Sequence, residues 1–277
     1  MSENAQQIEY WNGAIGERWA RLQGSIDASL SEIGKAAIAF AAPKAGERVL
    51  DIGCGCAATT LMLADAVGAG GVVEGIDISA PMLAVARERA AAARRKIDFM
   101  QADAASHVLT PRFDLVFSRF GVMFFADPAA AFANIAEAPS RKGRLAFVCW
   151  RGVGENLWAS VPFAAARDLV PEQPPSDPHA PGPFAFADDA RLRGILSAAG
   201  FANIRIKKLD VPMLMGADAD QAATHALNVG PLARAATGLD DETRAKIHAR
   251  AKTALAQFAG PQGVAVPAAC WLVGATL

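Results

Sequence analysis

The chain has 277 residues, of which 52% are hydrophobic, so it can build a sizeable core and is neither intrinsically disordered nor a small disulfide-stapled fold. Its 27 lysines and arginines nearly balance 28 aspartates and glutamates, for a formal net charge of −1, which argues against a nucleic-acid partner. Four cysteines are too few for a disulfide framework, and Cys54 and Cys56 lack the companion pair of a zinc site. We therefore expect a small-molecule partner, reduced thiols and no metal.

The N-terminal segment predicts helices rather than a targeting signal. Its first residues, MSENAQQIEYW, lack the basic start and apolar run of a signal peptide, and the chain has no stretch of 18 uncharged apolar residues. We expect a cytoplasmic location and no membrane span. Tyr10, Trp11 and Trp19 are spaced to lie on related faces of one helix, which either covers a ligand or only docks these rings on the core.

From residue 47 onward, short β-branched runs alternate with Ala-rich stretches. This is the pattern of βαβ units, with a parallel sheet covered by helices on both faces. The predicted strands are residues 48–52, 72–77, 97–101, 113–118 and 144–150, and the predicted helices are 57–68, 80–94 and 127–138. Two of these helices begin with good caps, because Ser79 precedes Ala80-Pro81 and Asp127 precedes Pro128.

The regular alternation ends after residue 150. Prolines 171, 174, 175, 178, 181 and 183 predict a long surface loop, a kind of segment that often serves as a lid. Two later strands, 201–209 and 264–275, flank a helical insertion and have no simple crossover, so we expect them to pair antiparallel. The predicted organisation is a region of N-terminal cap helices at 1–45, followed by one domain at 46–277 with cap insertions at about 151–186 and 216–260.

The most informative segment is VLDIGCGCAA, residues 49–58, an apolar strand that runs into a glycine-rich turn and a helix. Glycine lets the backbone turn tightly and approach a ligand, and the helix that follows presents free N–H groups. The next strand ends in Asp77, 22 positions after Gly55, where a carboxylate can accept hydrogen bonds from both ribose hydroxyls. The segment predicts a nucleotide-binding corner at the carboxyl ends of the strands, where Asp51, Asp77 and Asp103 all fall.

Two cofactors fit this corner. The spacing Gly53-x-Gly55-x-x-Ala58 also matches the loose dinucleotide pattern, so an NAD(P)-dependent oxidoreductase is an alternative. Asp51 favours a ligand with a cationic amino group and would repel a pyrophosphate. The single tyrosine, Tyr10, lies far from any Tyr-Lys pair that a reductase would need.

At these motifs the chain resembles the class I S-adenosylmethionine-dependent methyltransferases. VLDIGCGCA, EGIDIS, QADA and FDLVFSRFGVMFF are similar to successive motifs of that family, over about residues 46–150. Its small-molecule branch, the ubiquinone and menaquinone biosynthesis methyltransferases, is the nearest match. The resemblance implies an α/β, Rossmann-like, doubly wound fold with a seven-stranded sheet whose last strand is antiparallel, and with helical and loop insertions that form a substrate cap.

The resemblance also implies a site for S-adenosyl-L-methionine. Asp51 would help orient the amino end of this cofactor, Asp77 would bind the ribose hydroxyls, and Asp103 would accept a hydrogen bond from the adenine amino group. The other implied cofactor-binding residues are Gly53, Cys54 and Gly55 near the methionine part, Ile78, Met82 and Ala104 near the adenine, and Ser118 and Arg119, which line the floor through their backbone. Ala57 replaces the third glycine of the first motif, and it fits the turn if its φ angle is negative.

The sequence does not identify a catalytic residue, because in-line methyl transfer requires no covalent bond between the enzyme and the methyl group. His179, His225 and Tyr10 are the candidates for a general base, because they fall in segments expected near the substrate. The predicted function is transfer of a methyl group from S-adenosylmethionine to a small, mostly apolar acceptor, with S-adenosyl-L-homocysteine as product. The alternatives are the oxidoreductase above and a catalytically silent cofactor-binding protein.

Overall fold

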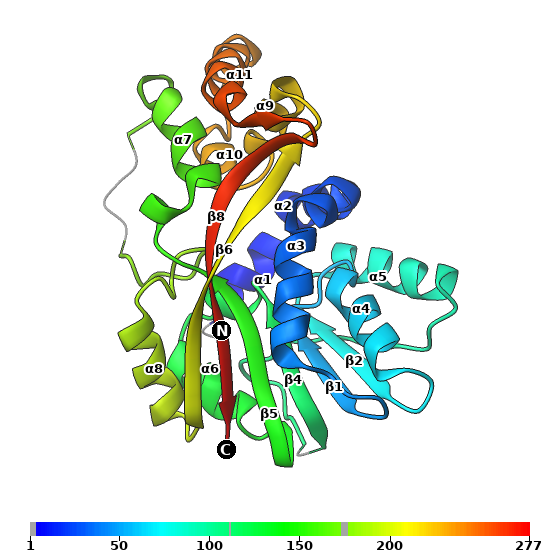
Figure 1. Ribbon diagram of the computed structural model, residues 1–277. Coiled ribbons are helices and arrows are strands. Elements are labelled where there is room, and N and C mark those ends of the chain that lie inside the picture. Colours follow the sequence, from blue (N-terminus) through cyan, green and yellow to red (C-terminus); the bar gives the residue numbers. More distant parts are fainter. Residues whose placement is uncertain (1–3, 111, 173–176) are drawn as a thin grey trace.

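The computed structural model describes residues 4–110, 112–172 and 177–277, and these residues build one mixed sheet with helices on both faces (Figure 1). The strand order is β3-β2-β1-β4-β5-β8-β6. The strands are β1 (Arg48–Ile52), β2 (Val72–Asp77), β3 (Asp98–Gln101), β4 (Phe113–Arg119), β5 (Pro139–Trp150), β6 (Ala202–Gly216), β7 (Ala259–Gly260) and β8 (Gly263–Thr276).

The sheet has the predicted doubly wound topology. Strands β1 to β5 pair in parallel, and the last strand, β8, lies antiparallel between β5 and β6. The predicted antiparallel last strand is therefore confirmed. The predicted count of seven strands holds for the main path, but the two-residue β7 adds an eighth strand by pairing with the start of β8. A two-residue strand is too short to leave a pattern in the sequence.

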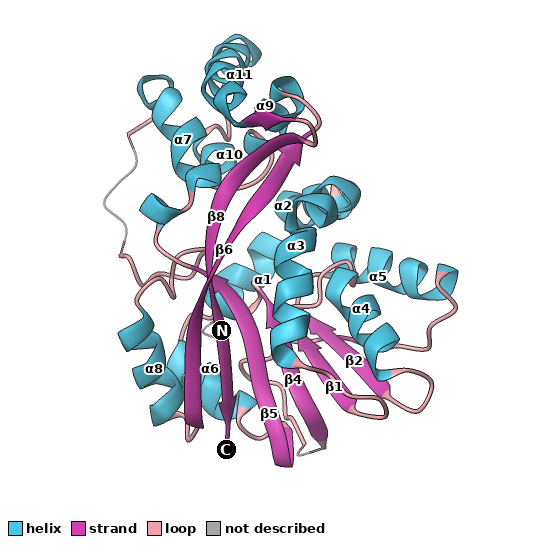
Figure 2. Cartoon of the chain, in the orientation of Figure 1, coloured by secondary structure: helices cyan, strands magenta, loops and turns pink. Residues whose placement is uncertain are grey.

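Helices cover both faces of this sheet (Figure 2). Helices α3 and α4 pack together on one face, and α6 and α8 pack together on the other. The helices are α1 (Ala5–Asn12), α2 (Ala14–Arg21), α3 (Gln23–Ala41), α4 (Ala58–Val67), α5 (Ala80–Ala92), α6 (Pro128–Ile135), α7 (Leu157–Ala165), α8 (Asp189–Ala198), α9 (Ala219–Ala226), α10 (Pro231–Ala235) and α11 (Asp241–Leu255). The predicted caps of α5 and α6 are present, because Ser79 and Asp127 accept hydrogen bonds from the first turn of each helix.

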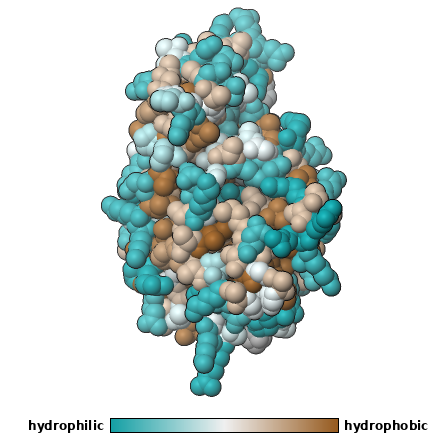
Figure 3. Space-filling model, turned by 45° about the vertical axis from the view of Figure 1, so that its right-hand side comes forward, coloured by the Kyte–Doolittle hydropathy of each residue, from teal (hydrophilic) through white to brown (hydrophobic). Residues whose placement is uncertain are grey.

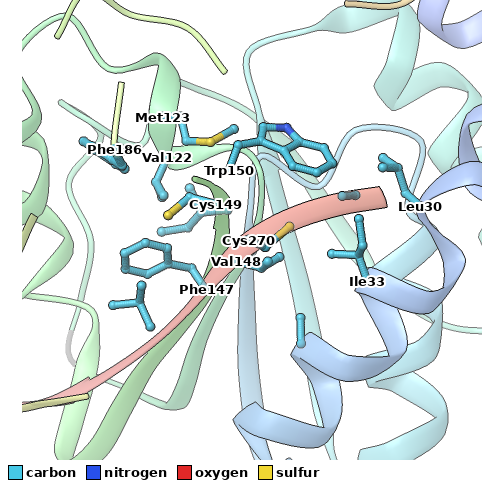
Figure 4. Close-up of a cluster of buried hydrophobic side chains, with 14 of the residues drawn as sticks. Leu30, Ile33, Val122, Met123, Phe147, Val148, Cys149, Trp150, Phe186 and Cys270 are labelled. Atoms are coloured by element: carbon cyan, nitrogen blue, oxygen red, sulfur yellow. The ribbon is translucent and has the colours of Figure 1, made fainter. Parts of the chain in front are cut away.

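The core lies on both sides of the central strands. Along β5 the side chains alternate, as they do in any strand: Phe147 and Cys149 point toward Phe186, whereas Val148 points toward Ile33 of α3 (Figure 4). All five side chains are buried. This double burial explains why the strand reads as a continuous apolar run rather than an alternating one.

The prediction of one helix through Tyr10 and Trp19 is wrong. The chain breaks at Gly13, whose extended backbone (φ −89°, ψ −157°) separates α1 from α2. The two helices then pack closely, because Gly16 has no side chain to strike the backbone oxygen of Trp11, which would lie 1.9 Å from a Cβ. The rings of Trp11 and Trp19 therefore meet across the two helices, with centroids 5.5 Å apart.

The late part of the chain extends the sheet into a long ribbon. Strands β6 and β8 stay paired beyond the end of β5, as far as Gly216 and Val264, and they carry α9, α10 and α11 at their far end (Figure 1). Helix α7 packs against all three of these helices. The ribbon therefore holds the 216–260 insertion next to the segment that follows β5.

Prolines 171, 178, 181 and 183 lie outside helices and strands, as the loop prediction requires, whereas prolines 174 and 175 lie outside the described residues. On the face shown in Figure 3, hydrophilic residues cover most of the top and the rim, and hydrophobic residues are exposed in patches across the middle. Among the described residues, no helix is both long enough and apolar enough to cross a membrane.

Candidate functional site

A cavity of about 840 Å³ lies at the carboxyl ends of the parallel strands, the edge at which open α/β sheets bind their ligands. The loops that follow β1, β2, β3, β4 and β5 line it from the sheet side. Residues of α1, α2 and α3, of the 177–188 loop and of α9 and α10 close it from the other sides. The volume is near the upper end of the range for small-molecule sites, so it has room for more than one small ligand.

The glycine turn after β1 forms one wall of the cavity, and its conformation requires glycine. Gly53 and Gly55 have positive φ angles of +68° and +52°, which other residues adopt only with strain. A Cβ on Gly53 would also lie 2.7 Å from the Cα of Gly121 in the loop after β4. The turn therefore exposes backbone to the cavity at a point where no side chain fits.

The expectation that Ala57 has a negative φ angle is wrong. Its φ is +65°, although the residue is fully buried at the start of α4. Its N–H donates to the carbonyl of Cys54 at 2.9 Å and closes the turn, which fixes the left-handed conformation. That conformation costs a non-glycine residue roughly 1–2 kcal/mol, so the alanine is accommodated under strain rather than without it.

Asp77 faces the cavity from the end of β2 with its carboxylate fixed in place. One oxygen accepts a hydrogen bond from the N–H of Gly55, and the other accepts from the N–H of Ser79, both at 2.8 Å. Each oxygen keeps a second lone pair for a ligand. Burial raises the pKa of Asp77, while these backbone N–H groups oppose the shift. The arrangement suits a ligand that presents two neighbouring hydroxyl groups.

Asp51 does not line the cavity. Its side chain is 1% exposed, and Oδ2 accepts hydrogen bonds from the hydroxyls of Thr59 and Thr60 at 3.0 and 2.7 Å. Burial raises the pKa of Asp51 to about 6, and its Oδ1 has no partner among the described residues. The structure therefore places this carboxylate against the first turn of α4, behind the glycine turn.

The other residues expected at the adenine end gather where β2 and β3 end. Ile78, Met82, Asp103 and Ala104 all line the cavity. Asp103 holds its own loop, because Oδ1 accepts from the N–H of Ala105 at 2.9 Å. Ile78 and Met82 follow β2, and Asp103 and Ala104 follow β3.

Ser118 and Arg119 differ from the expectation that both line the floor through their backbone. Ser118 is fully buried and is not among the lining residues, and its Oγ accepts from the N–H of Gly121. Arg119 does line the cavity, and its side chain is 14% exposed and lies 4.0 Å from the carboxylate of Asp27. Burial lowers the pKa of Arg119, and the negative charges of Asp27 and Asp51 oppose this shift.

Asp27, on α3, was not found by sequence reasoning. It pairs with Arg89 of α5 at 2.8 Å, and it lies near Arg119 at the end of β4. The three charges come from separate elements, so no local motif connects them. Together they form a charged cluster beside the glycine turn, and no described residue accepts a hydrogen bond from the Arg119 guanidinium.

Cys54 and Cys56 line the cavity as protonated thiols. Burial raises the pKa of Cys54 well above its usual value and raises that of Cys56 to about 12. A thiol is a weak nucleophile until it loses its proton. The turn thus offers two small side chains rather than a reactive sulfur.

The three candidates for a general base line the same cavity. His225, on α9, is 8% exposed, and burial lowers its pKa to about 4, so its ring is neutral at neutral pH. His179 lies exposed in the 177–188 loop, where its backbone N–H donates to Asp177. Burial raises the pKa of Tyr10, with the charges of Arg234 and Arg18 opposing the shift.

A row of aromatic side chains also lines the cavity. Phe120 stacks on Trp150 with centroids 4.2 Å apart and planes 10° apart. Trp150 contacts Trp158 at 4.8 Å, and Trp158 contacts Phe184 at 6.3 Å. We call these four residues the aromatic wall. The sequence predicts part of this wall, because the run at 120–125 indicates core and one wall of the pocket, whereas Trp150, Trp158 and Phe184 follow no such pattern.

Part of the chain is similar to known methyltransferases. Residues 49–143 match a family described as a methyltransferase domain. Aklanonic acid methyltransferase of Streptomyces sp. strain C5 is 39% identical over 117 residues, which are 42% of this chain and 53% of that protein. Demethylmenaquinone methyltransferase of Thermus thermophilus is 36% identical over 110 residues, which are 39% and 50%. The chain matches about half the length of these curated relatives.

A solved structure extends the likeness beyond the matched segment. Phosphoethanolamine N-methyltransferase 2 of Haemonchus contortus, in complex with phosphomonomethylethanolamine and S-adenosylhomocysteine, superposes with a TM-score of 0.55. The match covers 88% of this chain and 52% of that chain at 18% identity, so it shows a shared fold. Residues 49–143 thus resemble a methyltransferase domain, and the chain as a whole shares its fold with an S-adenosylhomocysteine-bound methyltransferase.

Proposed function

We propose that the protein transfers a methyl group from S-adenosylmethionine to a small, mostly apolar acceptor, and that both bind in the cavity described above. The observation that carries the proposal is Asp77, a carboxylate fixed by two backbone N–H groups at the carboxyl edge of the sheet. It lies beside a glycine turn that leaves room for a ligand. The fold and the matched methyltransferase domain support this assignment over an oxidoreductase.

The residues at this edge fit S-adenosylmethionine. Asp77 would accept hydrogen bonds from the two ribose hydroxyls, and Asp103 would accept one from the adenine amino group. Ile78, Met82 and Ala104 offer apolar surface for the adenine ring, and Gly53, Cys54 and Gly55 adjoin the methionine part. Asp51 would act on the amino group only by its charge, because its carboxylate lies outside the cavity wall.

We assign the carboxylate of the methionine part to Arg119. Its guanidinium faces the cavity near the glycine turn and has no hydrogen-bond partner among the described residues, while Asp27 holds it at 4.0 Å. Guanidinium groups bind carboxylates through paired hydrogen bonds. The side chain of Arg119, rather than its backbone, would therefore contact the cofactor.

When bound, S-adenosylmethionine supplies an electrophilic methyl group on a sulfonium. The task of the chain is to hold the acceptor in line with that group, and such positioning contributes up to roughly 7–11 kcal/mol to a rate. His225, His179 and Tyr10 line the cavity and are the candidates to hold or receive an acceptor proton. Helices α1 and α2, the 177–188 loop and α9–α10 would act as the substrate cap and exclude water.

The test is the affinity of the Asp77→Ala variant for S-adenosylhomocysteine, measured by calorimetry. Loss of two hydrogen bonds to a charged group, each worth about 1.5–3 kcal/mol, predicts a fall in affinity of about a hundredfold or more. Asp77→Asn, which keeps the shape of the side chain, should also bind weakly. Asp98→Ala is the matched control, because Asp98 is exposed at the other end of the neighbouring strand. Undiminished binding by both Asp77 variants would refute the site.

A further inference from the structure

The charged cluster of Asp27, Arg89 and Arg119 is built against the glycine turn. Asp27 and Arg119 line the cavity, as does Cys56 of the turn. Arg89 connects the cluster to the turn, because its guanidinium donates a hydrogen bond to the carbonyl of Cys56 and pairs with the carboxylate of Asp27. The fold therefore holds Asp27, a residue of α3, next to the part of the cavity assigned to the methionine end of the cofactor.

The two carboxylate oxygens of Asp27 have different surroundings. Oδ2 accepts a hydrogen bond from Nε2 of Gln23 at 2.5 Å and pairs with Nη2 of Arg89 at 2.8 Å. Oδ1 accepts no hydrogen bond from a described residue, and Nη2 of Arg119 approaches it only to 4.0 Å, which is beyond hydrogen-bond distance. The carboxylate is thus oriented through one oxygen and leaves the other available to a ligand.

The Arg119 side chain lies along α3, where Gly34 leaves room for it. A Cβ on Gly34 would lie 3.7 Å from Nη1 of Arg119 and 3.7 Å from Cγ2 of Thr59, so a large side chain at this position would displace the guanidinium. No described residue accepts a hydrogen bond from this guanidinium, although the side chain is only 14% exposed. A largely buried donor without a partner is costly, so a ligand that supplies the partner is favoured.

We propose that Oδ1 of Asp27 accepts a hydrogen bond from the α-ammonium group of the cofactor, while the Arg119 guanidinium takes the α-carboxylate of the same methionine part. This inference rests on the proposed function, because it takes the cofactor to be S-adenosylmethionine. It assigns to α3 a direct contact with the ammonium group, to which Asp51 contributes only its charge.

The spacing of the two free groups suits an amino acid. Its ammonium nitrogen and its carboxyl carbon are bonded to one carbon and lie about 2.5 Å apart, so the two groups can contact opposite sides of a gap of 4.0 Å. Each contact is a charge-assisted hydrogen bond, the stronger kind in proteins. One carboxylate and one guanidinium therefore recognise both charged groups of the ligand.

A simple anion fits this gap less well than a zwitterion does. An anion on Arg119 would also lie close to Oδ1 of Asp27, and like charges at such distances repel each other. The ammonium group of an amino acid instead satisfies Asp27 while the carboxylate satisfies Arg119. The pair therefore selects a ligand that carries both charges.

The experiment is calorimetry on the full chain with three ligands that differ only at this end. S-adenosylhomocysteine has both charged groups, 4-(5′-adenosylthio)butanoate lacks the amino group, and S-(5′-adenosyl)-3-thiopropylamine lacks the carboxylate. We expect the wild-type protein to bind each analogue about tenfold or more weakly than S-adenosylhomocysteine, because each analogue loses one charged hydrogen bond.

Two variants should separate the two preferences. Asp27→Asn should reduce the preference for S-adenosylhomocysteine over the butanoate analogue to about twofold or less, and it should keep the preference over the propylamine analogue. Arg119→Met should show the reverse pattern. A general loosening of the site would weaken the binding of all three ligands alike and would not produce this exchange.

Two control variants address the ion pairs themselves. Arg89→Met breaks the same ion pair as Asp27→Asn but keeps the Asp27 carboxylate, so it should keep the preference for the amino group. Asp65→Asn removes a carboxylate that pairs with Arg95 at 2.6 Å on the surface, and it should change none of the three affinities.

The outcomes distinguish this inference from the proposed function. If S-adenosylhomocysteine binds but the wild-type protein binds the butanoate analogue equally well, the ammonium group is not recognised and the inference is wrong, whatever the variants do. The inference is also wrong if Asp27→Asn keeps the full preference for the amino group, or if Arg89→Met loses it to the same extent as Asp27→Asn. In these cases the proposed function stands, whereas a protein that does not bind S-adenosylhomocysteine at all would overturn both.

Discussion

The carboxylates of Asp51 and Asp77 lie near the same glycine turn, but they have different hydrogen-bond partners. Asp77 faces the cavity and is held by two backbone N–H groups. Asp51 is buried against α4, where two threonine hydroxyls reach only one of its oxygens. The sequence predicts both as ligand-binding residues, because each ends or adjoins an apolar strand. Which one reaches the ligand depends on side-chain direction, which the motif does not encode.

Asp51 should give the folded protein a distinctive dependence on pH. Burial raises its pKa from 3.8 to about 6, so between these values the folded chain binds more protons at Asp51 than the unfolded chain does. Its contribution to stability is therefore lost as the pH rises from about 4 to 7. One pKa unit corresponds to about 1.4 kcal/mol, so the loss is on the order of 1–3 kcal/mol.

The Asp51→Asn variant tests this, because it removes the titrating group while keeping its size. The free energy of unfolding of the variant, minus that of the wild type, should increase by on the order of 1–3 kcal/mol between pH 4 and pH 7 in urea titrations. Asp98→Asn, at an exposed site, should show no comparable change. A difference between Asp51→Asn and wild type that stays constant with pH would contradict the account.

At the scale of elements, α1 and α2 are tied to the loop that carries Asp77. Nδ2 of Asn12 donates to the carbonyl of Ile78 at 2.8 Å, and its Oδ1 accepts from the N–H of Ala80 at 3.0 Å. Oγ of Ser79 donates to the carbonyl of Trp11 at 2.7 Å. These bonds anchor the first two helices to the residues that directly follow Asp77, the residue proposed to bind the ribose. In the sequence, 66 positions separate Asn12 from Ile78.

Removing this tie should loosen the cap while leaving the sheet intact. Each hydrogen bond contributes about 1 kcal/mol net, so Asn12→Ala should raise the dissociation rate of S-adenosylhomocysteine about tenfold. The variant should also speed hydrogen exchange along α1, and its melting temperature should change little. Stopped-flow dissociation and hydrogen-exchange measurements would report both effects. Gln6→Ala, at an exposed position of the same helix, should change neither, and equal rates in the two variants would exclude a cap anchored by Asn12.

Local pattern suffices for some of the regular elements but not for all, because β5 begins at Pro139 rather than at 144 and β6 runs to Gly216 rather than to 209. The limits of β1 and β2 match the predicted ranges, because apolar runs and flanking glycines mark their ends. The break at Gly13 and the positive φ of Ala57 have no such local pattern. The break accompanies the close packing of α1 and α2 at Gly16, and the φ angle of Ala57 is fixed by the turn that its N–H closes with Cys54. The direction of the Arg119 side chain likewise depends on Asp27, which lies 92 positions earlier.

The site residues divide in the same way. Gly53, Gly55, Asp77 and Asp103 lie in short motifs next to predicted strand ends, and the structure brings them to one cavity. The aromatic wall was predictable only at Phe120, which follows β4, because its other members come from β5, α7 and the 177–188 loop. Their spacing in the sequence follows no period, and only the sheet order and the β6–β8 ribbon bring them together.

At the scale of the whole molecule, the sheet supplies one side of the cavity and the parts outside the regular alternation supply the other. The β6–β8 ribbon extends beyond β5 and carries α9–α11 at its far end (Figure 1), and His225 of α9 is among the residues that line the cavity. One continuous cavity thus joins the glycine turn and Asp77 to the aromatic wall. Methyl transfer requires both ligands in a single enclosed space, and this arrangement provides it.

The most direct test of this account is a calorimetric titration of the wild-type protein with S-adenosylmethionine and S-adenosylhomocysteine, with NADH as the control ligand. We expect saturable, micromolar binding of the first two and no binding of NADH, since Asp77 and Arg119 suit ribose and a carboxylate whereas the buried Asp51 charge disfavours a pyrophosphate. Binding of NADH alone, or of none of the three ligands, would contradict it.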